Sequence, residues 1–198
     1  MWSAAILAGG QSRRLGGRPK GALPVGGRPI LARQLDVLRS LAPAAIVVVG
    51  VPGFDTPVDV PIVADAVPGA GALGGLYTAL AAAPSDPVLV VAGDLPFVSG
   101  PWLMHLVEVL GNADGVVPRT ADGRHPLCAV YRRRAAPRLK AWLDRGTRRI
   151  TDALSDLNVR EVGPDEVARF DPDGVLLMNV NTPEEYDRAC RHVNARRP

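Results

Sequence analysis

Residues 4–21 read AAILAGGQSRRLGGRPKG, and the rest of the fold is organised around them. The apolar run over residues 4–7 predicts a buried strand, which stops at the glycine pair Gly9 and Gly10. Glycines allow a backbone to approach an anion closely, and basic side chains supply charge that a polyphosphate can use. Four basic residues follow the pair: Arg13, Arg14, Arg18 and Lys20. The stretch is therefore typical of a phosphate-binding loop, with a solvated basic surface loop as the alternative.

Two better-known glycine motifs fit this sequence poorly. A Walker loop ends in lysine followed by serine or threonine, whereas Gly21 follows Lys20. Residues 69–74 do form a G-x-G-x-x-G, and Asp94 falls near the distance at which a Rossmann fold keeps its ribose-binding acid. However, residues 65–68 separate the preceding strand-like run from the first glycine, and a dinucleotide fingerprint needs the strand to run straight into the turn. An NAD-type oxidoreductase is therefore a minority hypothesis.

The length and composition indicate one globular unit. A chain of 198 residues with 47% hydrophobic content can build a substantial core. The net charge of +3 implies no nucleic-acid partner, and no apolar run approaches the length of a membrane span. Cys128 and Cys190 are the only cysteines and form no C-x-x-C, which argues against a disulfide scaffold and a structural zinc site. We expect a soluble, cytoplasmic protein that binds neither nucleic acid nor membranes.

The hydrophobic pattern predicts alternating strands and helices, which favours an α/β fold with a parallel sheet. The expected strands cover residues 4–7, 22–25, 44–50, 61–64, 87–92, 113–118, 125–131 and 175–178. The expected helices cover residues 29–41, 76–83, 101–110 and 132–143, and another opens at residues 148–149. Thr182, Pro183 and Glu185 form a capping box that starts the last helix, and the basic tail over residues 188–198 is expected to fray.

Two aspartates are expected at the carboxyl ends of strands, the edge at which open α/β sheets bind ligands. Asp65 ends the strand at residues 61–64, beside the glycine-rich stretch. Asp94 follows a more apolar strand and comes directly after Gly93, where a carboxylate is well placed to hold a divalent metal such as Mg²⁺. For each aspartate, the alternative is a turn-forming role. Asn179 and Asn181 would point to the same side of an extended strand, and the capping box does not explain them.

The run LAGGQSRRLGGRPKG over residues 7–21 resembles the signature loop of the sugar-nucleotide-type nucleotidyltransferases. Within them it is most similar to the molybdenum cofactor guanylyltransferases, whose usual form is L-A-G-G-x-S-x-R-M-G-G-x-D-K. Leu15 replaces the Met of that form, Pro19 replaces its Asp, and the H-P-x-x-A pattern at residues 125–129 matches the family again. The resemblance implies a single three-layer αβα domain over residues 1–198, with a Rossmann-like, mostly parallel sheet of the nucleotidyltransferase type.

The resemblance also implies roles for individual residues. Arg14, Lys20 and Asp94 would be catalytic, and Asp94 would bind Mg²⁺, the expected cofactor. The residues expected to bind the nucleotide, its phosphates or the acceptor are Leu7, Ala8, Gly9, Gly10, Gly17, Lys20, Asp65, Gly75, Asn179 and Asn181. His125 is expected either at the substrate or in a structural role. Arg148 and Arg149 are expected either near a pterin or on a solvated face.

The implied reaction is the transfer of GMP from GTP to molybdenum-molybdopterin with release of pyrophosphate. The double glycine of L-A-G-G is typical of guanylyltransferases, whereas the related cytidylyltransferases have L-A-A-G. The implied partners are GTP, molybdenum-molybdopterin and, in transient contact, proteins that build the cofactor or mature molybdoenzymes. Two alternatives remain open: a nucleotidyltransferase for another acceptor, such as a sugar phosphate, and a catalytically degenerate nucleotide-binding protein, for which Pro19 is the main argument.

Overall fold

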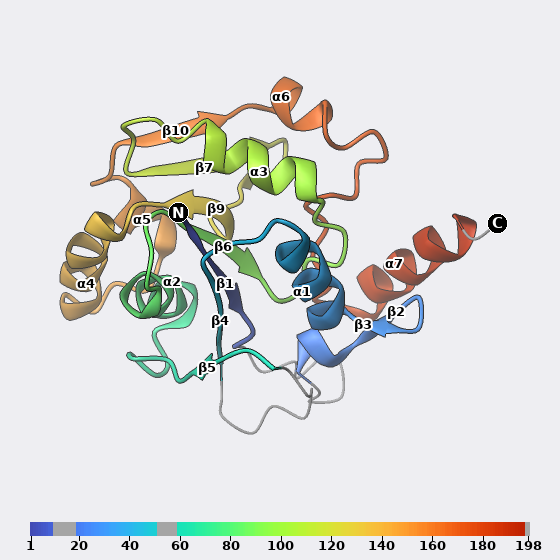
Figure 1. Cartoon of the computed structure of the whole chain (residues 1–198), viewed down its shortest axis with the longest axis horizontal. Coiled ribbons are helices and arrows are strands. Elements are labelled where there is room, and N and C mark those ends of the chain that lie inside the picture. Colours follow the sequence, from blue (N-terminus) through green and yellow to red (C-terminus); the bar gives the residue numbers. More distant parts are fainter. Residues whose placement is uncertain (10–18, 51–58, 197–198) are drawn as a thin grey trace.

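The computed structural model describes residues 1–9, 19–50 and 59–196, and these residues form a mostly parallel sheet between two layers of helices (Figure 1). The strand order is β10-β7-β9-β6-β1-β4-β5, and β8 pairs with β7. The strands are β1 Ser3–Leu7, β4 Ala45–Val49, β5 Ile62–Val63, β6 Val88–Ala92, β7 Gly115–Thr120, β8 Gly123–Arg124, β9 Cys128–Tyr131 and β10 Val159–Val162. β1 runs parallel to both β4 and β6, whereas β9 is antiparallel to β6 and β7. The predicted fold class is confirmed.

Helices cover both faces of the sheet (Figure 1). α1 and α3 lie on one face, and α2, α4 and α5 lie on the other. The helices are α1 Ile30–Ser40, α2 Gly71–Ala82, α3 Gly100–Glu108, α4 Ala136–Asp144, α5 Ile150–Leu154, α6 Pro164–Ala168 and α7 Pro183–Ala195, with 3₁₀ turns η2 Lys20–Ala22 and η3 Arg133–Ala135. A small second sheet pairs β2 Pro24–Val25 with β3 Arg28–Pro29 and lies beside α7. No helix of the described residues is long and apolar enough to cross a membrane.

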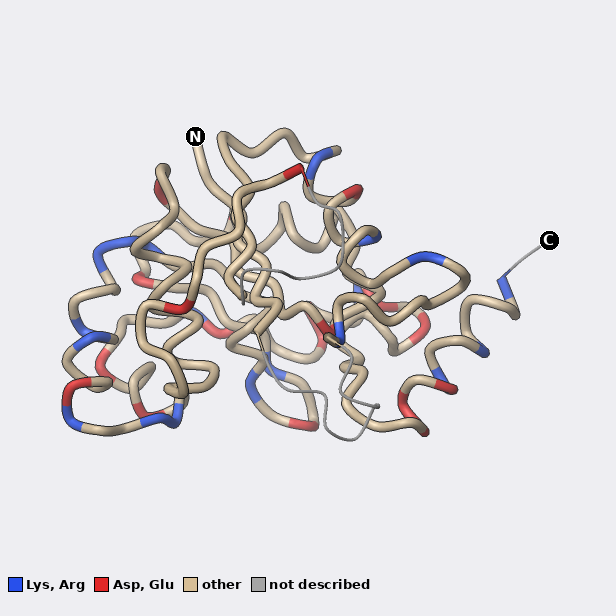
Figure 2. Tube along the Cα trace, turned by 90° about the horizontal axis from the view of Figure 1, so that it is seen from below, with Lys and Arg blue, Asp and Glu red and all other residues tan. Residues whose placement is uncertain are grey.

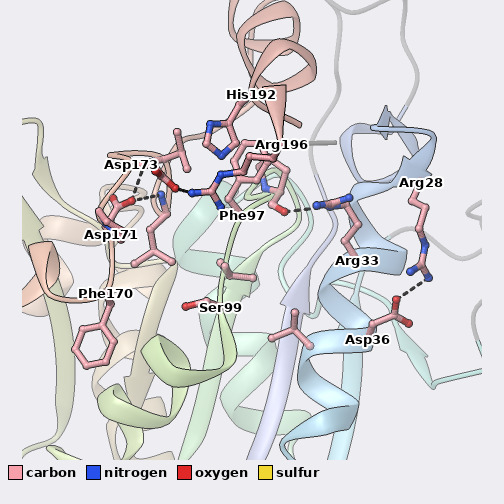
Figure 3. A pocket seen from close by; sticks show the side chains of 16 residues that line it. Arg28, Arg33, Asp36, Phe97, Ser99, Phe170, Asp171, Asp173, His192 and Arg196 are labelled. Carbon is pink, nitrogen blue, oxygen red and sulfur yellow. Dashed lines mark hydrogen bonds and ion pairs between the residues drawn. The ribbon is translucent and has the colours of Figure 1, made fainter. Parts of the chain in front are cut away.

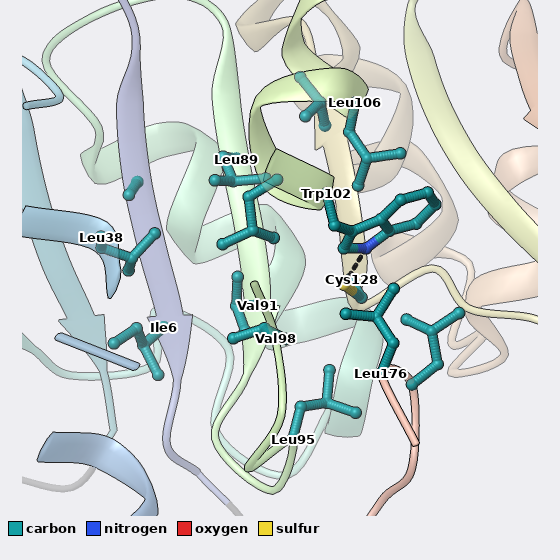
Figure 4. Close-up of a cluster of buried hydrophobic side chains, with 14 of the residues drawn as sticks. Ile6, Leu38, Leu89, Val91, Leu95, Val98, Trp102, Leu106, Cys128 and Leu176 are labelled. Atoms are coloured by element: carbon teal, nitrogen blue, oxygen red, sulfur yellow. Dashed lines mark hydrogen bonds between the residues drawn. The ribbon is translucent and has the colours of Figure 1, made fainter. Parts of the chain in front are cut away.

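The central strand β1 is buried on both sides, which explains its continuous apolar sequence. Successive side chains of a strand point to opposite faces, so Ala4 and Ile6 join the core under α1 and α3. Ala5 and Leu7 join the core under α2 and α4. Figure 4 shows the first of these cores, in which the Trp102 indole donates to the Cys128 thiol across 3.5 Å. The two cores fix the height at which β1 ends, and therefore the position of the loop that follows it.

Most of the glycine-rich stretch before the second predicted helix, at residues 76–83, is part of that helix. α2 begins at Gly71 rather than near residue 76. A Cβ on Gly74 would lie 2.8 Å from the Ala70 Cβ and 3.1 Å from the Val67 carbonyl oxygen, so this residue allows a close approach. Residues 64–68 separate β5 from Gly69, and the G-x-G-x-x-G therefore does not form the strand-to-helix turn of a dinucleotide fold.

Two expectations near the carboxyl end were wrong, and one strand was not predicted. Residues 175–178 form no strand: Leu176 and Leu177 are buried in a loop whose amides at Val175 and Leu176 donate to Asp171. The edge strand is instead β10, which the sequence analysis did not predict. The tail from residue 188 does not fray along its described length, because α7 continues to Ala195 and packs Ala189 and Val193 on the small sheet. Residues 197–198 lie outside the described residues.

Candidate functional site

A cavity of about 640 Å³ opens where β1, β4 and β6 end. Segments that follow four parallel strands meet there, and such an edge is where open α/β sheets bind ligands. The cavity is lined by Leu7, Ala8, Gly9, Lys20, Gly21, Val49, Gly50, Ala64, Asp65, Pro68, Gly69, Gly71, Ala72, Gly75, Ala92, Gly93, Asp94 and Leu127. Small and apolar residues dominate the walls, while Lys20, Asp65 and Asp94 supply charge.

At the mouth of this cavity, Gly93 lets the ends of β1 and β6 lie close together. A Cβ on Gly93 would lie 3.0 Å from the Leu7 carbonyl oxygen and 3.2 Å from the Ala8 Cα, so any other residue there would push the ends of β1 and β6 apart by a few tenths of an ångström. The Gly93 amide also donates to the Leu7 carbonyl at 2.9 Å. The Ala8 amide donates to Val49 at 2.8 Å, and it is therefore not free to bind a phosphate, although Ala8 lines the cavity.

Lys20, Asp94 and Asn181 come together at this mouth from distant parts of the chain. The Lys20 ammonium donates to Asp94 Oδ2 at 3.0 Å and to Asn181 Oδ1. The Lys20 and Asp94 side chains are only 26% and 15% exposed, so solvent screens their attraction incompletely. Asp94 Oδ1 is buried and has no hydrogen-bond partner in the part of the chain that the structure describes. A buried carboxylate oxygen without a donor is costly unless a ligand uses it.

The donor set at this point suits a magnesium ion. Mg²⁺ prefers carboxylate and carbonyl oxygens and takes the rest of its ligands from water and substrate phosphates. Asp94 Oδ1 and the Asn181 carboxamide oxygen provide such ligands beside the cavity. Over residues 1–9, 19–50 and 59–196, no three His, Cys, Asp or Glu side chains cluster. A metal here would therefore depend on the substrate for much of its coordination, as nucleotide-bound magnesium does.

Asn181 is held in place by the capping box of α7. The Val180 amide donates to the Asp94 carbonyl at 2.9 Å, which ties the carboxyl-terminal segment to the end of β6. Glu185 then accepts from the amides of Asn181 at 2.6 Å and Thr182 at 3.0 Å, so the predicted capping box is confirmed and also orients the site. Neither asparagine lines the cavity, but Asn181 contacts Lys20, which does, whereas Asn179 is exposed. The two asparagines lie in a segment that forms no strand, so the expectation that they share one side of a strand was wrong.

Asp65 lies on the opposite wall and is engaged by its own turn. Its Oδ1 accepts from the Val67 amide at 3.1 Å and from the Thr78 hydroxyl at 2.9 Å. Thr78 is buried in α2 and also accepts from the Ala66 amide at 3.0 Å. The Thr78 proton is shared with the Gly74 carbonyl, also at 2.9 Å. Sequence analysis missed Thr78, although a lone threonine in the apolar stretch LYTALAA is a signal that the sequence offers.

The remaining predicted residues divide into three groups. Leu7, Gly9 and Gly75 line the cavity, as do Lys20 and both aspartates. Gly10, Arg14 and Gly17 lie outside the described residues. His125 lies away from the cavity, where its ring pairs with the Thr120 hydroxyl at 2.8 Å. Burial lowers the pKa of His125, and the Asp122 carboxylate only partly offsets this effect.

Arg148 reaches the rim of the cavity. Its guanidinium donates to the Gly69 carbonyl at 2.9 Å, and Gly69 lines the cavity with a φ of +77°. Arg149 is the N-cap residue of α5 and makes no side-chain capping bond. Only Arg148, therefore, is connected to the site in the way that a substrate-side arginine would require.

A second cavity, of about 540 Å³, lies between α1, the loop after β6 and the end of α7 (Figure 3). Two of its arginines form ion pairs within the cavity: Arg28 pairs with Asp36 at 2.6 Å, and Arg196 pairs with Asp173. Over the whole described surface, basic and acidic residues are interspersed rather than gathered on one face (Figure 2). The cavity at the strand ends is therefore the stronger candidate for a charged ligand.

The first cavity combines glycine-lined backbone, a lysine and oxygen ligands for a cation. These are the groups that a nucleoside triphosphate with bound metal requires, because its phosphates need both close backbone approach and neutralising charge. On an open α/β sheet of this topology, they define a nucleotidyltransferase.

Comparison with known proteins narrows this class. The MobA-like NTP transferase domain matches residues 4–158. The molybdenum cofactor guanylyltransferase of Desulfosudis oleivorans is 31% identical over 193 residues, which cover 97% of this chain and 96% of that protein. The protein of the same name from Vibrio cholerae is 28% identical, with 92% and 88% covered. The crystal structure of molybdopterin-guanine dinucleotide biosynthesis protein A from Archaeoglobus fulgidus superposes with a TM-score of 0.85 at 26% identity, covering 98% and 99% of the chains. The chain belongs to the MobA-like NTP transferase family, among the molybdenum cofactor guanylyltransferases.

Proposed function

We propose that this protein transfers GMP from GTP to molybdenum-molybdopterin, releasing pyrophosphate and forming molybdopterin guanine dinucleotide. The observation that carries the proposal is the convergence of Lys20, Asp94 and Asn181 at the mouth of a glycine-lined cavity. The names of the relatives support the choice of GTP and of the pterin acceptor. Transient contact with proteins that deliver or receive the cofactor belongs to the same proposal.

The nucleotide base is assigned to the wall formed by Asp65 and the start of α2. The turn uses Asp65 Oδ1, while Asp65 Oδ2 makes no hydrogen bond with the described residues. A carboxylate oxygen can accept from the N1 and N2 donors of guanine, and leaving those donors unpaired would be costly. Leu7, Val49 and Pro68 give the apolar surface against which a base ring can pack.

Lys20 is assigned to the phosphates. Its ammonium now lies between Asp94 Oδ2 and Asn181 Oδ1, two oxygens that a divalent cation would also use. When a nucleotide binds with its metal, Lys20 exchanges these oxygens for those of the α- and β-phosphates, where it neutralises the charge of the leaving pyrophosphate. Lys20 thereby keeps one Asp94 oxygen and the Asn181 oxygen paired until substrate arrives, and leaves Asp94 Oδ1 for the metal.

Asp94 and Asn181 are assigned to Mg²⁺, which supplies charge neutralisation for the phosphates when bound. Both substrates are anions, so the protein's main tasks are to hold them in line and to stabilise developing charge. No covalent nucleophile is needed for this reaction. Arg14, which lies outside the described residues, is assigned to the transferred phosphoryl group on the family resemblance, and Arg148 lies at the rim where the pterin would enter.

Product analysis tests the proposal. GTP labelled at the α-phosphate is incubated with Mg²⁺ and molybdenum-molybdopterin, and the label is followed into the dinucleotide by chromatography. The wild type and the control Lys140→Met, which changes an exposed lysine paired only with Asp144, should transfer label equally. Lys20→Met should lose transfer. Label that remains in GTP with wild-type protein, or Lys20→Met turnover equal to the control, would contradict the assignment.

A further inference from the structure

Gln34 is a buried polar side chain in the middle of α1, only 1% exposed, and it holds the turn that carries Asp94. Its amide nitrogen donates to the carbonyls of Ala92 at 2.7 Å and Leu95 at 2.9 Å. These two carbonyls flank Gly93 and Asp94 in the sequence. One side chain from a helix therefore closes both ends of the two-residue segment on which the site depends.

The other backbone groups of this turn are also fixed from outside. The Gly93 amide donates to Leu7, and the Asp94 carbonyl accepts from Val180. Arg33, next to Gln34 in α1, donates from Nε to the Pro96 carbonyl at 3.4 Å (Figure 3). β6 ends at Ala92, and the Ala92 carbonyl also accepts from the Leu95 amide at 3.3 Å within the turn, so Gln34 adds a shorter bond from outside.

The buried amide of Gln34 lowers the stability of the fold at one of its two polar atoms. Its Oε1 is buried and has no hydrogen-bond partner in the described ranges of the chain. The neighbouring α1 side chains Leu31, Leu35 and Leu38 pack into the apolar core. An apolar residue at position 34 would avoid the cost of the unpaired oxygen. Exchanging the amide's oxygen and nitrogen would not help, because an oxygen would then face two carbonyl oxygens. The two N–H bonds to the turn are thus what this amide contributes.

We propose that Gln34 is a positioning residue for the metal site: it restrains the Gly93-Asp94 turn so that the Asp94 carboxylate stays aimed at Lys20 and Asn181. This inference rests on the proposed function, since it assumes that Asp94 binds the metal. Glycine loses more conformational freedom on folding than any other residue, so a turn that contains Gly93 needs external restraint. Gln34 acts through Asp94 and does not line the cavity itself.

The test is binding of Mn²⁺ to nucleotide-free protein, followed by electron paramagnetic resonance. Gln34→Met keeps the length and volume of the side chain but removes its donors, and Gln34→Leu serves as a second variant if the first folds poorly. Asp94→Asn reports whether Asp94 is the metal ligand. Leu139→Ala, in the core on the opposite face of the sheet, reports the effect of general destabilisation. Circular dichroism and thermal unfolding confirm that each variant is folded.

We expect Gln34→Met to weaken Mn²⁺ binding about three- to tenfold and Asp94→Asn to weaken it further, with Leu139→Ala at the wild-type affinity. In turnover assays, Gln34→Met should raise the Mg²⁺ concentration for half-maximal rate and leave the KM for GTP at saturating Mg²⁺ unchanged. Wild-type Mn²⁺ affinity in Gln34→Met beside a loss in Asp94→Asn would overturn this inference alone. So would an equal loss in Leu139→Ala. Wild-type affinity in Asp94→Asn would overturn the metal assignment, and the inference with it.

Discussion

Asp65 and Asp94 both follow a strand of the same sheet and face the same cavity, yet their carboxylates are engaged differently. Asp65 Oδ1 accepts from the Val67 amide and the Thr78 hydroxyl, residues within the same turn and the helix that follows it. Asp94 Oδ2 accepts from Lys20, and Asp94 Oδ1 is buried without a partner in the described chain. Two aspartates at strand ends can therefore face the same cavity and still differ in which of their oxygens are available to a ligand.

The two walls also differ in how far along the chain they reach. The partners of Asp65 lie 2 and 13 residues away, so its turn needs only local structure. Lys20 lies 74 residues from Asp94 and 161 from Asn181, so the cluster of these three residues forms only when the whole sheet and α7 are assembled. The side of the cavity at Asp65 is built by one turn and the helix after it, whereas the contacts of Asp94 bring charged and polar groups together from distant parts of the chain.

Substitution of the two aspartates should give the largest difference in kinetics between the two sides of the cavity. Asp94→Asn should lower kcat by about 10²-fold or more, because it removes the charge that holds the metal. Asp65→Asn keeps an oxygen for the turn, so we expect a several-fold higher KM for GTP and a nearly unchanged kcat. Steady-state kinetics of both variants measure this difference. Equal losses of kcat would show that the two walls are not distinct.

Lys20→Met should have the next largest effect, with two readouts of opposite sign. Turnover should fall by about 10²-fold, since the ammonium no longer neutralises the phosphates. Mn²⁺ binding to the nucleotide-free protein should become tighter, because the cation that pairs with Asp94 and Asn181 has gone. Lys140→Met is the matched control and should change neither quantity. Weaker Mn²⁺ binding in Lys20→Met would contradict the competition between lysine and metal.

Thr78→Val should act on the wall of Asp65 alone. The substitution removes the hydroxyl that donates to Asp65 and accepts from the Ala66 amide, which should cost about 1–3 kcal/mol of unfolding free energy. The KM for GTP should rise a few-fold, and the Mg²⁺ dependence should stay unchanged. Thr151→Val, on the exposed surface of α5, is the control. A shift of the Mg²⁺ dependence in Thr78→Val would show that the Asp65 side of the cavity and the proposed metal site are coupled.

His125 should show the smallest effect, confined to stability. Burial lowers the pKa of His125, so the unfolded chain takes up a proton at a higher pH than the folded protein does. The contribution is fully present above the unfolded pKa of about 6.5 and is lost as the pH falls below it. His125→Gln should therefore flatten the decline in Tm between pH 7 and pH 5, without changing kcat at pH 7.5. An unchanged slope would contradict the effect of burial on His125, and a large loss of turnover would place His125 in the site.

The sequence predicts well the part of the proposed metal site that the strand ends of the sheet form. The continuous apolar runs of β1 and β6 and the abrupt stops at Gly9 and Gly93 predict two parallel strands that end together. The capping box predicts the start of α7 for a local reason that no tertiary contact overrides. These features depend on residues that are close in sequence, and a pattern along the chain can report them.

The rest depends on contacts that no local pattern records. Gln34 lies on the buried face of the amphipathic α1 and Thr78 lies in the more apolar α2, and only the fold shows which carbonyls and carboxylates they reach. The apolar residues 175–178 resemble a strand, but the Asp171 carboxylate turns the chain there. The prediction that Asn179 and Asn181 point to one side rested on that strand, and of the two it is Asn181 that contacts Lys20.

Pyrophosphate release from Mg-GTP and Mg-CTP, each with and without molybdenum-molybdopterin, tests most directly whether this cavity transfers guanylate to the pterin. We expect release that requires both GTP and the pterin, that is much slower with CTP, and that disappears in Asp94→Asn. Release that is equal with CTP, release that does not require the pterin, or no release from protein that binds GTP would each contradict a guanylyltransferase built around Asp94.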